Sequence, residues 1–327
     1  MKSFENIDVK SVAEAVALLQ KFHQQRKHAL VVGGGSEALQ LVKDNVLTPE
    51  YVINLKTIPG LNAIKEERSG FRIGALATLA DVEDHSGVRD KLLILAAAAG
   101  EAASPQIRNA GTLGGNICQR PFCWYFRSSN FNCLRKGGQL CYTVTGDGRF
   151  HAILGGGPSY IVHPSDTAPA LVALGAQIKI AGPAGERTVP LEKFFVLPSV
   201  DYRRENILKA AEIVTEIYVP MPKAGSKGFY HKVREREAWD HAIVAVATVV
   251  QSNGGVARDG RVVLGGVAPI PWRAPKAEAF LRGKKLDDGV ARQAGAIALE
   301  GARPLKDNVY KVKMAQDLVR RGLLDSV

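Results

Sequence analysis

Four cysteines are the side chains of this sequence best suited to chemistry. They are the only cysteines among 327 residues, and all of them fall within one short segment, at Cys118, Cys123, Cys133 and Cys141. Thiols that gather in this way commonly share a metal, whereas disulfides are disfavoured in a chain without an export signal. The segment therefore predicts a metal centre.

The spacing of the cysteines bears on the identity of that metal. Four, nine and seven residues separate successive cysteines. Four thiolates can hold either a [4Fe–4S] cluster or a tetrahedral zinc ion, but the C-x2-C pairs typical of structural zinc ribbons are absent. The pattern favours the iron–sulfur cluster, with zinc as the alternative. Aromatic side chains at 122 and 124–126 would either shield such a cluster from water or pack an ordinary core.

Two glycine-rich loops are candidates for holding a phosphate-bearing cofactor. Gly33-Gly34-Gly35-Ser36 follows the apolar run 29–32, and glycines at a strand end let backbone N–H groups approach a pyrophosphate. A glycine triplet alone is more often a tight turn, and this one lacks the G-x-G-x-x-G order. The second loop, 108–116, adds three glycines and the side chains of Thr112 and Asn116, which can hydrogen-bond phosphate or the polar edge of a flavin. Two such loops together indicate a nucleotide site.

A third polar element is the Ser165-Asp166 pair. The carboxylate of Asp166 can accept hydrogen bonds from ribose hydroxyls, or the pair can cap the helix that follows it. Both interpretations remain open from the sequence. No Ser/His/Asp or Cys/His arrangement that would act as nucleophile and base is present.

The elements that would position these residues alternate between helices and strands. Ser11 and Glu14 form a capping box, and apolar residues at helical spacing follow to Phe22. Further helices are expected at 91–103, 166–174, 276–281, 289–299 and 308–322. Strands are expected at 29–32, 51–55, 71–76, 160–162, 176–180, 242–251 and 261–267, with a hairpin turn at Asn253-Gly254-Gly255. This order predicts an α+β fold, with a linker and domain boundary at 220–227.

Composition narrows the class of protein. A hydrophobic content of 46% allows a substantial core, and no apolar run approaches the length of a membrane span. The net charge is +11, but Lys and Arg are dispersed rather than clustered with stacking aromatics, which argues against nucleic-acid binding. The first residues do not form a secretory signal, so we expect a cytoplasmic protein or a periplasmic one exported together with a signal-bearing partner.

The motifs together resemble one family. Residues 33–36, 108–116 and 165–166, with the later stretches 265–269 and 271–274, are similar to the FAD subunits of xanthine dehydrogenase-type molybdenum hydroxylases, and the likeness runs over nearly the whole chain. It implies a two-part FAD-binding domain of the PCMH/vanillyl-alcohol-oxidase type over 1–222, with an iron–sulfur insertion at about 117–150. A smaller α+β C-terminal domain would follow over 223–327, with 265–274 serving fold and subunit packing.

The resemblance also implies which residues contact FAD. The loop that matches 33–36 wraps the pyrophosphate in the family, the loop that matches 108–116 lies against the flavin, and Asp166 matches an acidic residue near the adenosine end. Lys232 matches a lysine near the flavin, where a cation can stabilise the reduced isoalloxazine; the alternative is an exposed strand lysine. The expected FAD contacts are Val32, Gly33, Gly34, Gly35, Ser36, Glu37, Asn109, Gly111, Thr112, Gly114, Gly115, Asn116, Ser165, Asp166 and Lys232.

A subset of the family carries an extra [4Fe–4S] cluster in a comparable insertion, as in flavin subunits resembling those of 4-hydroxybenzoyl-CoA reductase and bacterial aldehyde oxidoreductase. The resemblance implies an electron-transfer subunit whose partners are a large subunit with the molybdenum cofactor, a small [2Fe–2S] subunit and an external electron acceptor. It leaves the substrate open among aldehydes, N-heterocycles and aromatic thioesters. The alternatives are a self-contained FAD oxidoreductase and a zinc-stabilised scaffold subunit.

Overall fold

The N-terminal part of the molecule is built on a small parallel sheet. The computed structural model describes residues 1–327, and its first sheet has the strand order β1-β3-β2, formed by Glu5–Asp8, Tyr51–Asn54 and Ala29–Val32. The expected first helix is confirmed as α1 (Val12–Gln24): Ser11 Oγ accepts from Glu14 N at 3.1 Å, and one stripe of α1 is buried. The first glycine loop begins directly where β2 of this unit ends.

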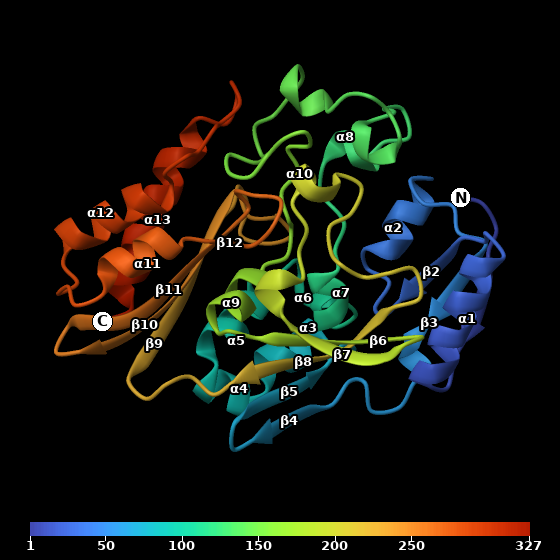
Figure 1. Ribbon diagram of the computed structural model, residues 1–327, viewed down its shortest axis with the longest axis horizontal. Helices are drawn as coiled ribbons and strands as arrows, with labels where there is room; N and C mark the ends of the chain where they lie inside the picture. Colours follow the sequence, from blue (N-terminus) through green and yellow to red (C-terminus); the bar gives the residue numbers. More distant parts are fainter.

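A five-stranded antiparallel sheet is formed by strands from the first two thirds of the chain (Figure 1). Its order is β4-β5-β8-β6-β7, from Ile64–Glu67, Gly70–Gly74, Ile213–Pro220, Gln177–Gly182 and Gly185–Pro190. The short helices of this part of the chain are α2 (Ala38–Lys43), α3 (Leu79–Asp84), α4 (Ser86–Lys91), α5 (Leu93–Gly100), α6 (Pro105–Arg108), α7 (Leu113–Ile117), α9 (Thr167–Ala173) and α10 (Pro198–Asp201), with 3-10 turns at Leu55–Thr57 and Leu191–Lys193. Apolar residues of α3, α5, α7 and α9 share one buried core with the sheet, and this core supports the second glycine loop.

The last third of the chain forms a four-stranded antiparallel sheet with helices on one face. Its order is β12-β11-β10-β9, from Trp272–Arg273, Val256–Gly265, Val244–Asn253 and Ser226–Val233. Gly254 and Gly255 have positive φ, so the expected hairpin between β10 and β11 is confirmed. Figure 1 shows α11 (Pro275–Leu281), α12 (Asp288–Ala298) and α13 (Tyr310–Asp325) beside this sheet, while the earlier helices α5 and α9 contact its strands.

The cysteine segment contains little regular structure. It holds α8 (Trp124–Arg127) and the 3-10 turns Leu134–Lys136 and Tyr142–Val144, and in Figure 1 it lies above the sheets, near α10. The strand expected at 160–162 is wrong: this stretch has no regular secondary structure and joins none of the three sheets. The expected linker is shorter than 220–227, because β8 runs to Pro220 and β9 begins at Ser226.

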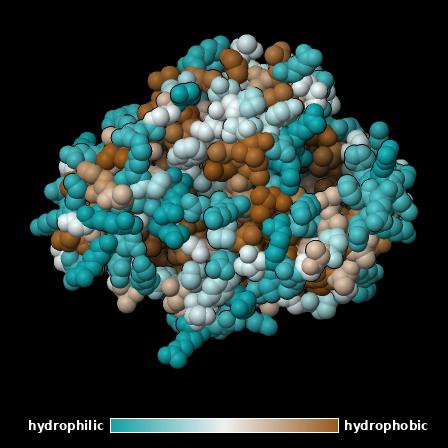
Figure 2. Space-filling model, viewed as in Figure 1, coloured by the Kyte–Doolittle hydropathy of each residue, from teal (hydrophilic) through white to brown (hydrophobic).

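The surface has an uneven distribution of apolar side chains. Figure 2 shows hydrophilic side chains around the outline of one face and apolar side chains gathered nearer its centre. Large apolar residues with substantial exposure include Leu93, Leu140, Val200 and Val309. None of the helices combines the length and the apolar character that crossing a membrane requires.

Candidate cofactor site

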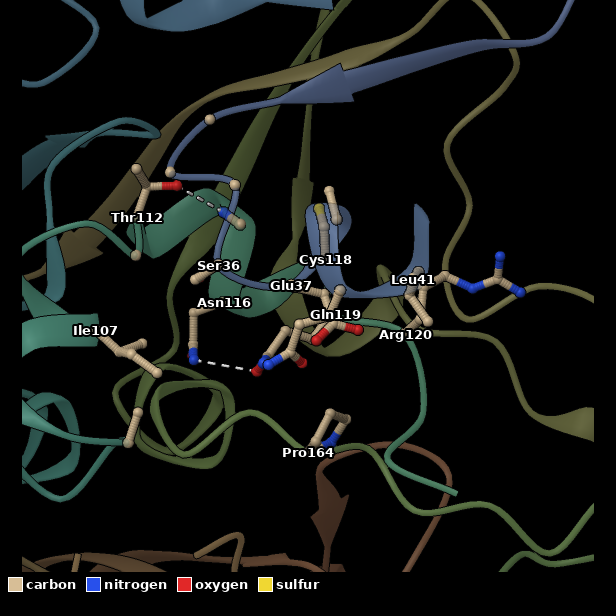
Figure 3. Close-up of a pocket in the computed structure, with 18 of the residues that line it drawn as sticks. Ser36, Glu37, Leu41, Ile107, Thr112, Asn116, Cys118, Gln119, Arg120 and Pro164 are labelled. Carbon is tan, nitrogen blue, oxygen red and sulfur yellow. Dashed lines mark hydrogen bonds between the residues drawn. The ribbon is translucent and has the colours of Figure 1, made fainter. Parts of the chain in front are cut away.

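A cavity of about 370 Å³ lies where the two glycine loops meet. Figure 3 shows its wall, formed by residues after β2, by the start and end of α7, and by Pro164. Of the expected FAD contacts it brings together Val32, Gly33, Gly34, Gly35, Ser36, Glu37, Gly111, Thr112, Gly115, Asn116 and Asp166. Segments distant in sequence therefore converge on one hollow of the size that small-molecule sites have.

The first glycine loop needs Gly34 because the two loops touch backbone to backbone. A Cβ built on Gly34 would lie 1.8 Å from the carbonyl oxygen of Ala110, which no real Cβ does. The neighbouring Gly33 is less constrained, since its Cβ would meet the Thr112 side chain at 3.0 Å. Gly33, Gly34 and Gly35 all line the cavity, so no side chain of theirs separates the backbone from a ligand.

The second loop is held in place by a helix cap and by the central sheet. Thr112 Oγ1 accepts from Gly115 N at 3.1 Å, an interaction drawn in Figure 3, and so caps α7. Gly114 N donates to Ala75 O at 2.9 Å, and a Cβ on Gly114 would meet Ala75 at 2.8 Å. Gly114 thus packs against the sheet rather than lining the cavity. Asn109 is exposed and lies outside it.

A buried hydroxyl cluster joins the end of α7 to the start of α9. Asn116 Oδ1 accepts from Ser165 Oγ and from Thr167 Oγ1, both at 2.6 Å. Asn116 Nδ2 donates to Gln119 Oε1 at 3.2 Å (Figure 3), so all polar atoms of this side chain are engaged. Ser165 accepts from Ala168 N at 3.0 Å and lines a smaller neighbouring cavity of about 90 Å³. Ser165 therefore both positions Asn116 and caps α9.

Asp166 does not cap α9; its carboxylate is part of a buried ion pair. Lys232 Nζ lies 2.9 Å from Asp166 Oδ2, and Tyr230 OH donates to Asp166 Oδ1 at 2.8 Å. Lys232 also donates to the Glu101 carbonyl at 2.8 Å, and its side chain has 0% exposure, so it is not a surface lysine. Burial raises the pKa of Asp166, and the Lys232 ammonium opposes this shift. Asp166 lines both cavities, whereas Lys232 lines neither.

Several cavity residues escaped the sequence analysis because they come from distant segments. Trp239 and His241 follow β9, and Phe122 belongs to the cysteine segment. Trp239 has φ of 76°, a conformation uncommon for a large side chain, and its N–H donates to Ala103 O at 3.0 Å. The positive φ of Trp239 is the one unusual local feature of these three residues. It could not be seen in the sequence, because it is a property of the folded backbone.

Two buried histidines near the site make stability depend on pH. Burial lowers the pKa of both His163 and His241 to about 4. Unfolded histidine takes up its proton near pH 6.5, so between pH 6.5 and 4 the unfolded chain binds more protons. Stability is therefore expected to fall as the pH drops through this window, by about 1.4 kcal/mol per pH unit for each histidine. Urea unfolding of the flavin-free chain at several pH values measures the slope.

A His163→Gln variant is the control for that slope. The His163 ring accepts from Ser165 N at 3.3 Å and lies 3.2 Å from the Ile117 carbonyl, contacts that a glutamine amide can also make without titrating. In this variant the slope of unfolding free energy against pH is expected to be smaller by the contribution of one histidine, about 1.4 kcal/mol per pH unit. An unchanged slope would show that His163 titrates normally in the folded chain.

The four cysteines do not all lie together. Cys123, Cys133 and Cys141 line one small void of about 10 Å³, whereas Cys118 lines the large cavity. No three His, Cys, Asp or Glu side chains are arranged as ligands of a single metal ion. Burial raises the pKa of the Cys118 thiol to about 12 and that of Cys123 to about 11, so the thiolate forms need a cationic centre nearby.

Unsatisfied polar atoms are concentrated around the void between the three cysteines. Arg135 Nε and Nη1, Thr143 Oγ1 and His151 Nδ1 are buried without a hydrogen-bond partner. The other nitrogen of the His151 ring, Nε2, lies 3.2 Å from Cys123 Sγ. Orphaned buried groups are rare in native proteins and call for a partner that the protein atoms do not provide. A sulfur-rich, anionic group fits this set of donors.

An ion pair connects the cysteine segment to the first glycine loop. Arg127 Nη2 lies 2.5 Å from Glu37 Oε1, and both side chains are mostly buried. The Arg127 guanidinium also stacks over Phe122 at 5.0 Å. Burial raises the pKa of Glu37, and Arg127 opposes that shift. Any group held by the segment would therefore lie close to the glycine loops, with Glu37 as the contact between them.

Comparison with known proteins gives matches along the whole chain. Residues 2–222 match the family described as the FAD binding domain in molybdopterin dehydrogenase, and residues 229–326 match the CO dehydrogenase flavoprotein C-terminal domain. The chain is 34% identical to the aldehyde oxidoreductase FAD-binding subunit PaoB of Escherichia coli, over 97% of this chain and 96% of that one. It is 30% identical to the carbon monoxide dehydrogenase medium chain of Hydrogenophaga pseudoflava, over 98% and 96%. A solved structure of that dehydrogenase, lacking the Mo-pyranopterin moiety of its cofactor, superposes with a TM-score of 0.79 at 30% identity, covering 99% of this chain and 97% of that one.

Proposed function

The chain belongs to the FAD-binding subunits of the molybdopterin dehydrogenases, and from this premise we propose that it is the electron outlet of a molybdenum hydroxylase complex. In this proposal a partner subunit oxidises the substrate at a molybdenum cofactor, and a small [2Fe–2S] subunit relays the electrons. This chain holds FAD and a [4Fe–4S] cluster and passes the electrons to an external acceptor. The observation that carries the proposal is the convergence of both glycine loops on one cavity.

The cavity suits FAD because its wall offers different chemistry at different places. The Gly33–Ser36 loop presents backbone N–H groups, which match a pyrophosphate. The Thr112–Asn116 loop presents a rigid polar surface for the flavin ring. A carboxylate accepts about four hydrogen bonds, so Asp166 keeps free capacity for ribose hydroxyls while Tyr230 and Lys232 hold it.

The bound flavin would supply the redox chemistry, accepting electrons and releasing them to the acceptor. The protein residues bind, orient and shield it. Phe122, Trp239 and His241 wall the cavity on the side of the C-terminal sheet and would limit the access of water to the ring. The buried Lys232 ammonium would act at a distance, by holding Asp166 in its charged form beside the ligand.

The cysteine segment supports a cluster through its buried donors as well as through its thiols. Cys123, Cys133 and Cys141 surround one void together with the unsatisfied Arg135 and Thr143 side chains. Cys118, the cap residue of α7, would complete the ligand set by turning from the flavin cavity toward this void when the cluster is inserted. Cys118 would then lie between the two cofactors.

The two family matches support a division of the chain into a flavin domain and a C-terminal domain. We propose boundaries at 1–222 and 223–327, with the cluster insertion at about 117–150. The closing walls of the cavity come from the second domain, so both domains would be needed for flavin retention. The likeness to an aldehyde oxidoreductase subunit makes an aldehyde the first substrate to test for the complex.

Anaerobic purification of the full chain, followed by flavin, iron, sulfide and zinc analysis, tests this function. One FAD with about four irons and four sulfides per chain is expected. Cys133→Ser and Cys118→Ser are each expected to lose iron while retaining flavin. One zinc per chain would contradict the cluster, and no flavin after reconstitution would contradict the flavin subunit and favour a scaffold.

A turnover assay separates the electron outlet from a self-contained oxidoreductase. The isolated chain, loaded with FAD, is expected to show no reduction by aldehydes, because the reacting centre lies in another subunit. Its flavin should still be reduced by dithionite, which is the positive control. Reduction of the flavin by an aldehyde in the isolated chain would favour the self-contained enzyme.

A further inference from the structure

Resting on the cluster proposed above, we infer that Arg135 donates hydrogen bonds from Nε and Nη1 to the sulfur atoms of that cluster and raises its reduction potential. The guanidinium shares the 10 Å³ void with Cys123, Cys133 and Cys141. Its side chain has 2% exposure, and only Nη2 is engaged, in an ion pair with Glu205. One edge of the guanidinium is thus held by the protein, while Nε and Nη1 have no acceptor.

Leaving these N–H groups unpaired would cost free energy. A buried donor without a partner costs about 1–3 kcal/mol, more when it belongs to a charged group. Two other nitrogens without hydrogen bonds, Arg120 Nε and His231 Nε2, lie 2.9 and 2.8 Å from carboxylate oxygens, so each has an acceptor group beside it. Arg135 has no such second carboxylate. Its free donors point to an acceptor other than a protein side chain.

The charge around Arg135 gives independent support. Glu205 pairs with both Arg120 and Arg135, so two cations share one buried anion and one positive charge remains. Arg120 lines the flavin cavity and reaches Glu205 through Nε, whereas Arg135 lies outside that cavity, at the void between the cysteines. Beside Arg135, whose side chain is 2% exposed, this excess positive charge favours an anionic neighbour. An iron–sulfur cluster with thiolate ligands carries net negative charge and meets that need.

Hydrogen bonds to sulfur and nearby positive charge stabilise the reduced cluster, which is the more negative state. The transfer adds one electron to the cluster and moves no proton to or from Arg135. Arg135 therefore makes the cluster easier to reduce than the cysteines and the surrounding aromatic side chains alone would.

The test is an anaerobic redox titration of the cluster in the purified full chain, followed by EPR. Arg135→Met removes donors and charge, and it is expected to shift the reduction equilibrium at least tenfold toward the oxidised cluster, about 59 mV for one electron. Arg135→Lys keeps the charge but loses the separate Nε and Nη1 donors, so a smaller shift in the same direction is expected. Arg149→Met removes an exposed cation of the same segment and is the matched control, with less than a threefold change expected.

The possible outcomes separate this inference from the proposed function. Wild-type protein without iron would overturn the cluster itself. Wild-type protein with a cluster whose potential does not change in Arg135→Met would overturn only the role of Arg135. If Arg135→Met fails to retain iron, Arg135→Lys decides: a shifted potential with altered EPR g-values supports the inference, and an unchanged potential overturns it.

Discussion

Gly34→Ala is expected to abolish flavin retention in the purified protein. Its new Cβ would lie 1.8 Å from the Ala110 carbonyl oxygen and 2.6 Å from the carbonyl carbon. Both are backbone atoms and cannot rotate away, so the two glycine loops must separate by more than an ångström. We expect FAD affinity to fall at least about 100-fold, since that ratio corresponds to about 3 kcal/mol. Flavin fluorescence during titration of the flavin-free variant measures it.

Two further glycine substitutions calibrate this result. Gly33→Ala meets only side chains, those of Thr112 and Leu76 at 3.0 and 3.1 Å, so a smaller loss of affinity is expected. Gly289→Ala lies in the first turn of α12, far along the chain, where the new Cβ would meet only the flexible Asp287 carboxylate at 3.3 Å. It should bind FAD as the wild type does. Equal affinity of Gly34→Ala and Gly289→Ala would show that the cavity is not the flavin site.

Lys232→Met is expected to produce the largest loss of stability. It leaves the buried Asp166 carboxylate without its cation, with Tyr230 as the remaining donor. Breaking a buried pair by removing one partner costs about 3–5 kcal/mol. Urea unfolding of the flavin-free wild type and variant measures this loss of stability, as the difference between their free energies of unfolding. Because burial raises the pKa of Asp166 in the folded state, the deficit should shrink as the pH is lowered toward that pKa.

A double variant distinguishes charge from packing in this pair. Asp166→Asn combined with Lys232→Met removes both charges and should recover a large part of the deficit. Lys313→Met, which breaks an exposed ion pair with Asp317 on α13, should change stability little. If the double variant is no more stable than Lys232→Met, the deficit arises from lost packing of the lysine stem, not from an unpaired carboxylate.

Local signals in the sequence predicted much of the architecture. Ser11 and Glu14 place the start of α1, and Gly254 and Gly255 place the β10–β11 turn, because caps and positive-φ turns depend on neighbouring residues only. The two glycine loops were also predicted, because backbone segments that approach each other closely require glycine, and glycines can be seen in the sequence. Eleven of the fifteen expected FAD contacts line the cavity. This supports the interpretation of two glycine-rich loops together as parts of one nucleotide site.

Features that depend on the tertiary fold could not be predicted. The apolar stretch 160–162 satisfies a strand pattern, but no strand of the three sheets pairs with it. Nothing near Lys232 in the sequence shows that Asp166 will lie opposite it. The cavity walls at Trp239 and His241 depend on where the C-terminal sheet docks. The void between three cysteines, with Cys118 apart from it, likewise follows from the path of an irregular segment.

The position of β8 has a consequence for synthesis of the protein. β8 lies between β5 and β6 in the central sheet, although it follows both in the chain and is complete only at Pro220. The sheet therefore cannot close until the ribosome has made two thirds of the protein, and pairings this distant in sequence form slowly. All four cysteines emerge well before that, as unprotected thiols on an unfinished chain. Folding then competes with oxidation of these thiols, and expression at low oxygen tension should improve the yield of intact subunit.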